Sequence, residues 1–143
     1  MKRLLVVCTG NICRSPLAEV WFRDEIPGLQ VESAGTGALI GNPADPDAIA
    51  VARSHGHDLS SHRGRQIESQ MILDADLVLV MEEAHLKQIR VMFPWATGKI
   101  WRLGHQSGED VADPYKQGLA RFEEAYQTIC RLGRFWLPHL RFP

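Results

Sequence analysis

The chain has 143 residues, of which 45% are hydrophobic, and its formal net charge is −1. This length and apolar content predict one domain, residues 1–143, and the near-neutral charge argues against nucleic acid as a partner. No apolar run approaches the roughly 18 residues of a membrane span, and LLVVC near the start is too short for a signal peptide. We therefore expect a cytoplasmic protein without membrane insertion.

Strands and helices are predicted to alternate along the chain. Apolar runs predict the strands, and stretches bounded by caps, glycine or proline predict the helices. In chain order they are a strand over 3–8, a helix opened by Ser15 as its cap and running to Glu25, a strand over 29–33, a helix over 46–55 stopped by Gly56, a strand over 76–81, a helix over 82–92, a strand over 99–103 and a C-terminal helix over 118–136. This order predicts a single-domain three-layer α/β/α fold with a four-stranded parallel sheet.

The stretch CTGNICRSP, residues 8–16, joins the first predicted strand to the first predicted helix. A loop that leads into a helix N-terminus turns several backbone N–H groups toward one point, where an oxyanion can bind. Arg14 can hold two phosphate oxygens, and the same positive surroundings favour the thiolate form of Cys8. We predict a phosphate-binding loop with Cys8 as nucleophile and Arg14 as phosphate ligand, completed by Thr9, Gly10, Asn11, Ile12, Cys13 and Ser15, the last placed to donate a hydrogen bond to the sulfur. The competing interpretation is a buried core cysteine beside an ordinary helix-start arginine.

Three segments resemble the low-molecular-weight protein tyrosine phosphatases: CTGNICRSP, then SAGTGALIGNPADP at residues 33–46, then DPY at 113–115. Further similarity in SHRGRQI, DLVLVMEEAHLKQI and GHQSGEDVADPYK extends the resemblance over nearly the whole chain. The last two segments are most similar to the bacterial branch found with exopolysaccharide export systems. The resemblance implies phosphotyrosine hydrolysis through a phosphocysteine intermediate, no cofactor, and a membrane tyrosine autokinase as the protein substrate. We expect a monomer or a weak dimer.

The resemblance also implies roles for residues outside the loop. An Asp-Pro pair is by itself typical of a turn, but the family's acid matches Asp113, which would protonate the leaving oxygen and then activate water. Ser33 and His62 match positions that hydrogen-bond to the loop asparagine. The pocket wall is expected from Tyr115 and from Leu39 or Ile40. His55, His57 and His62 are close in sequence, but no cysteine or carboxylate pattern completes a zinc site, so no metal is expected.

Cys13 and Ile12 bear on the alternatives. We expect Cys13 to form a reversible disulfide with Cys8 under peroxide, or else simply to fill space under the loop. Relatives that act on phosphoarginine carry threonine where Ile12 stands, which favours tyrosine here. Two further alternatives remain: an arsenate reductase-like oxidoreductase, which would need additional reactive cysteines although Cys130 is expected in the core, and a catalytically silent phosphotyrosine-binding module.

Overall fold

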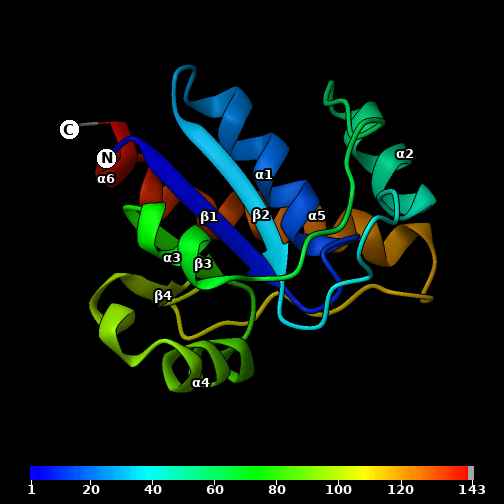
Figure 1. Cartoon of the computed structure of the whole chain (residues 1–143). Helices are drawn as coiled ribbons and strands as arrows, with labels where there is room; N and C mark the ends of the chain where they lie inside the picture. Colours follow the sequence, from blue (N-terminus) through cyan, green and yellow to red (C-terminus); the bar gives the residue numbers. More distant parts are fainter. Residues whose placement is uncertain (142–143) are drawn as a thin grey trace.

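A parallel four-stranded sheet forms the centre of the protein in a computed structural model that describes residues 1–141 (Figure 1). The strands are β1 (Arg3–Cys8), β2 (Gln30–Gly35), β3 (Leu77–Val80) and β4 (Ile100–Arg102), in the order β2-β1-β3-β4. Cys8 pairs with Gly35, so β1 and β2 end side by side. Because all strands are parallel, their carboxyl ends meet at one edge of the sheet, where ligands bind in such folds.

Alternate residues of the buried strands define the two helical layers. Leu4, Val6 and Cys8 belong to a core with α1 (Arg14–Glu25), α2 (Pro46–Ser54) and α5 (Leu119–Gly133). Leu5 and Val7 belong to a second core with α3 (Ser69–Asp74), α4 (Glu83–Met92) and the 3-10 helix η1 (Pro94–Lys99). The chain then continues through η2 (Arg134–Trp136) and α6 (Leu137–Arg141). The predicted α/β fold with a four-stranded parallel sheet is therefore confirmed.

The structure corrects several predicted boundaries. Helix α1 begins at Arg14 with Cys13 as its N-cap, so Ser15 is not the cap; its hydroxyl bonds to the Cys8 sulfur instead. Strand β2 extends to Gly35, two residues past the predicted end. The short helices α3 and α6 and the 3-10 helix η1 were not predicted, and the C-terminal helix ends as α5 at Gly133 before turning into η2. Among residues 1–141, no helix combines the length and apolar character needed to cross a membrane.

Candidate active site

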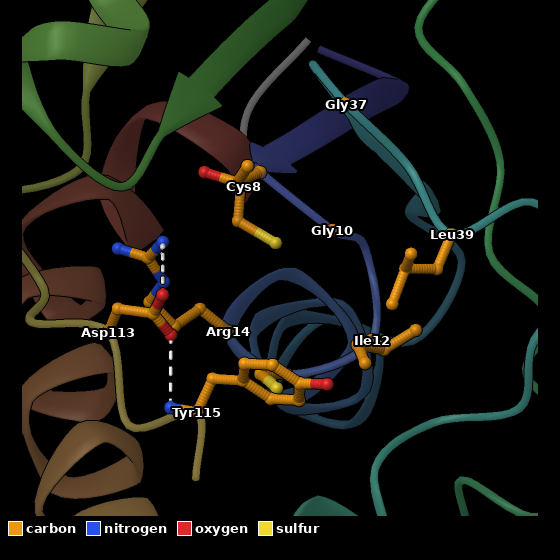
Figure 2. Close-up of a pocket in the computed structure, with 10 residues that line it drawn as sticks. Cys8, Gly10, Ile12, Arg14, Gly37, Leu39, Asp113 and Tyr115 are labelled. Carbon is orange, nitrogen blue, oxygen red and sulfur yellow. Dashed lines mark hydrogen bonds and ion pairs between the residues drawn. The ribbon is translucent and has the colours of Figure 1, made fainter. Parts of the chain in front are cut away.

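A cavity of about 220 Å³ opens at the carboxyl ends of the strands. It is lined by the loop after β1 and by two later segments: Cys8, Thr9, Gly10, Ile12, Cys13, Arg14, Gly37, Leu39, Asp113 and Tyr115. Figure 2 shows the Cys8 side chain pointing into the cavity, with Arg14 and Asp113 on one side and Ile12 and Leu39 on the other. The fold thus brings the predicted nucleophile, phosphate ligand and acid to one place.

The loop after Cys8 turns its carbonyl groups away from the cavity. Each carbonyl of residues 8–12 accepts a hydrogen bond from outside the loop: four from backbone amides of the segment 36–45, and one from His62 Nε2, 2.6 Å from Asn11 O. In a trans peptide the following N–H points the opposite way from the carbonyl. The amides of residues 9–13, which donate no hydrogen bond within the described part of the chain, therefore face the cavity and are available to an oxyanion.

Asn11 sets the curvature of this loop. Its backbone φ is 58°, the left-handed conformation that asparagine tolerates better than most residues. The side chain is 0% exposed and fully bonded: Nδ2 donates to Ser15 Oγ (2.8 Å) and Ser33 Oγ (3.0 Å), and Oδ1 accepts from the Arg65 amide (2.8 Å). The backbone that bends the amides inward is thus held by three hydrogen bonds.

Ser15 lies between this network and the nucleophile. Its Oγ is 2.9 Å from Cys8 Sγ and accepts from Asn11 Nδ2, so its own proton is free to be donated to the sulfur. A donated hydrogen bond stabilises a thiolate more than a thiol. For Cys13, burial above all, together with the charges of Asp45 and Cys8, raises the pKa far above its usual range, so this second thiol stays protonated.

Arg14 is 2% exposed and is held by the segments that follow β3 and β4. Its Nη1 donates to Val111 O at 2.8 Å and lies 3.1 Å from Glu82 Oε2, while Nη2 lies 3.9 Å from Asp113 Oδ2. Asp113 is 52% exposed, and its Oδ1 accepts from the Tyr115 amide at 3.1 Å. The guanidinium is therefore held in place, whereas the Asp113 carboxyl group makes only a long contact with it and is open to a substrate.

Residues 3–141 match the family model described as low molecular weight phosphotyrosine protein phosphatase. The chain belongs to this family. A probable low molecular weight protein-tyrosine-phosphatase, EpsP of Ralstonia nicotianae, is 47% identical over 141 residues, which cover 99% of this chain and 97% of the relative. The family and the bacterial branch predicted from the sequence are both confirmed.

Solved structures show the same fold with different activities. The tyrosine phosphatase Wzb of Escherichia coli K30, solved with sulphate, has a TM-score of 0.92 and 40% identity, and the match covers 97% of this phosphatase and 98% of the Wzb chain. The YwlE arginine phosphatase of Geobacillus stearothermophilus has a TM-score of 0.91 and 32% identity, covering 99% of this phosphatase and 94% of its own chain. The fold alone therefore does not separate the two phosphoryl substrates, and the pocket wall has to be considered.

The wall of the phosphatase pocket is apolar. Leu39 and Tyr115 line it together with Ile12, whereas Ile40, 71% exposed, is not among the lining residues. Lys116 Nζ lies 5.3 Å from the centre of the Tyr115 ring. A wall of apolar and aromatic side chains suits a flat aromatic group better than a charged one.

Glu82 and His85 reach the site but were missed in the sequence. Both lie at the start of α4, where they form a capping box: the Glu82 side chain accepts from the His85 amide, and the Glu82 amide donates to His85 Nδ1 at 3.2 Å. The sequence signal that could have indicated this capping box is a glutamate at the start of a predicted helix, followed three residues later by a side chain that can form hydrogen bonds.

The three clustered histidines have separate partners. His55 bonds to Glu123, His57 to Asp24 and Tyr126, and His62 to the phosphate loop. Within residues 1–141, no group of three or more His, Cys, Asp or Glu side chains is arranged to hold a metal ion.

Proposed function

We propose that this phosphatase hydrolyses phosphotyrosine in proteins through a phosphocysteine intermediate on Cys8. The observation that carries the proposal is the direction of the loop: carbonyls outward, amides inward, with the Cys8 sulfur and the Arg14 guanidinium at the same cavity. Preorganised donors of this kind stabilise the charge of a transferring phosphoryl group more than that of the ground state.

Two steps account for the bonds made and broken. In the first, the Cys8 thiolate attacks phosphorus, the P–O bond to tyrosine breaks, and Asp113 gives its proton to the leaving oxygen. In the second, the Asp113 carboxylate takes a proton from water, and the resulting hydroxide displaces the sulfur from phosphorus. Inorganic phosphate leaves, and the thiolate and the acid are restored.

The test compares three variants on phosphotyrosine and on an aryl phosphate with a more acidic phenol. Cys8→Ser should abolish turnover, and Asp113→Ala should lower it by roughly 10²–10⁴ with phosphotyrosine. The loss should be smaller with the acidic phenol, which needs less protonation. Glu109→Gln, on the same segment but paired with Arg131 on the surface, is the matched control and should resemble the parent. Full turnover in Cys8→Ser would end the mechanism, and equal Asp113→Ala losses on both substrates would move the acid elsewhere.

We propose that the physiological substrate is a membrane tyrosine autokinase of exopolysaccharide synthesis or export, and that the phosphatase acts on it from the cytoplasm. The similarity to EpsP and Wzb supports this assignment. A Cys8→Ser or Asp113→Ala trap, incubated with extract from the native cell, should retain a phosphotyrosine-containing membrane kinase. Recovery of arginine-phosphorylated proteins would overturn the substrate class.

The pocket gives physical reasons to prefer tyrosine over the alternatives. Ile12 lines the pocket together with Leu39 and offers no polar partner to a guanidinium. Arsenate reduction would need further reactive thiols at the cavity, but Cys130 is buried in α5 within the core, where burial raises its thiol pKa. Thioredoxin-coupled arsenate reduction, assayed beside phosphate release, should therefore be negligible.

A further inference from the structure

His85 connects the start of α4 to the phosphate loop, 76 residues earlier in the sequence. The imidazole is 3% exposed, and its Nε2 lies 2.8 Å from Thr9 Oγ1. Its other nitrogen, Nδ1, is 3.2 Å from the Glu82 amide nitrogen. Thr9 immediately follows Cys8, so this buried side chain contacts the first residue of the loop after the nucleophile.

The Glu82 amide determines which nitrogen of His85 carries the proton. An amide N–H can only donate, so Nδ1 must be the acceptor and the proton of a neutral ring lies on Nε2. Burial, and then the positive charge of Arg14, lower the pKa of His85 below its ordinary value of 6.5, so the ring is neutral at pH 7. His85 Nε2–H therefore donates to the Thr9 hydroxyl oxygen.

The same residue also acts on the far end of the loop. The His85 amide donates to the Glu82 carboxylate, which lies 3.1 Å from Arg14 Nη1. His85 Nε2 is 3.5 Å from that carboxylate as well. One buried side chain and its own amide thus join both ends of the phosphate loop, Thr9 and Arg14, to the junction of β3 and α4.

We propose that His85 is a positioning residue for phosphoryl transfer, which holds the amides after Cys8 through the Thr9 hydroxyl and the Arg14 guanidinium through Glu82. The inference rests on the proposed function, because it assigns His85 to the same reaction. Loss of His85 should destabilise the transition state, in which the loop amides make their strongest hydrogen bonds, more than it weakens the binding of the aryl group.

Two substitutions separate the two bonds of the ring. In His85→Asn the side-chain oxygen takes the place of Nδ1 and keeps the cap but cannot reach Thr9, whereas in His85→Gln the amide takes the place of Nε2 and can still donate to Thr9. His85→Asn should lower kcat on an aryl phosphate by roughly 2- to 10-fold, the effect of one buried hydrogen bond, with KM changed less. Inhibition by vanadate should weaken by a similar factor. His85→Gln should restore most of kcat.

A double-mutant cycle with Thr9→Val tests the route through Thr9. Thr9→Val should reproduce the loss seen in His85→Asn, and the double variant should lose no more than either one, because both remove the same bond. His105→Asn, the same substitution at an exposed histidine outside the cavity, should have parent kinetics.

Parent kinetics in His85→Asn would overturn the proposal, as would fully additive losses with Thr9→Val. So would activity that follows thermal stability across the variants with no rescue by His85→Gln. If Cys8→Ser keeps its turnover, the proposed function fails instead. An inactive Cys8→Ser beside an unaffected His85→Asn would refute only the role of His85.

Discussion

Replacing Asn11 by alanine should destabilise the fold and disable the phosphate loop together. The side chain is completely buried, and its three hydrogen bonds connect the loop to Ser15, Ser33 and the Arg65 amide. At a net contribution of about 1 kcal/mol for each bond, the loss is about 3 kcal/mol of the free energy of unfolding. The backbone φ of 58° adds to this cost, because alanine tolerates the left-handed conformation less well than asparagine.

A graded control is built into the same network. Ser33→Ala removes one of the three bonds and leaves Asn11 bonded to Ser15 and Arg65, so it should cost about 1 kcal/mol. Urea unfolding at pH 7 measures both variants, and the Asn11→Ala loss corresponds to a fall in Tm of roughly 10 °C for a chain of this length.

Activity gives the second readout for Asn11→Ala. Turnover of an aryl phosphate, measured at a temperature where the variant is folded, should fall by at least about 10-fold. The reason is that a relaxed loop no longer points its amides at the phosphoryl oxygens. The reasoning would be refuted by a destabilisation below about 1 kcal/mol, which the bond count does not allow. It would also be refuted by turnover within twofold of the parent, since the loop would then keep its shape without this side chain.

Three further predictions concern the surroundings of the loop. Gly35→Ala places a Cβ 2.3 Å from Thr9 O and should cost roughly 1–3 kcal/mol and most of the activity, whereas Gly98→Ala, with no atom within 4 Å, should be neutral in the same unfolding and turnover assays. Because the pKa of His85 is lowered in the folded protein, the unfolded chain binds a proton first as the pH falls, so the stability that the neutral His85 contributes should be complete above about pH 6.5 and decrease below it. Urea unfolding of His85→Asn at several pH values should show a smaller change of the free energy of unfolding with pH than the parent shows. An unchanged pH dependence would contradict the assignment. After peroxide and then added thiol, Cys13→Ser should recover less activity than the parent, and equal recovery would leave Cys13 a packing residue.

The sequence was most informative where the chemistry is local. A strand, a loop and a helix in direct succession place Cys8 and Arg14 on one turn, so their proximity follows from the local order of elements. Asp113 is different, because an Asp-Pro pair is common in turns and its distance from Arg14 depends on the path of the chain after β4. The residues alone predict a turn at Asp113-Pro114, and only the family resemblance identified Asp113 as the acid.

Long-range side-chain contacts explain what the sequence did not reveal. The serine after Arg14 has the features of a helix cap, yet its hydroxyl is used by Asn11 and by the Cys8 sulfur. His85 has an amphipathic helix pattern around it that predicts a surface or core residue equally well, and its bond to Thr9 depends on β1 and β3 being neighbours. Gly35 lies in β2 past the predicted end, where it pairs with Cys8 and where an added Cβ would lie 2.3 Å from Thr9 O.

The strand order explains why the site draws on four separate segments. β1 carries the nucleophile and lies between β2 and β3, so each neighbour ends beside the phosphate loop. The segment after β2 donates to the loop carbonyls and thereby turns the amides inward. The segment after β3 supplies Glu82 for Arg14, and the segment after β4 supplies Val111 O and Asp113. A nucleophile on an edge strand would lack one of these neighbours, so the central position of β1 is what allows a short loop to be held from both sides while the acid approaches from a third.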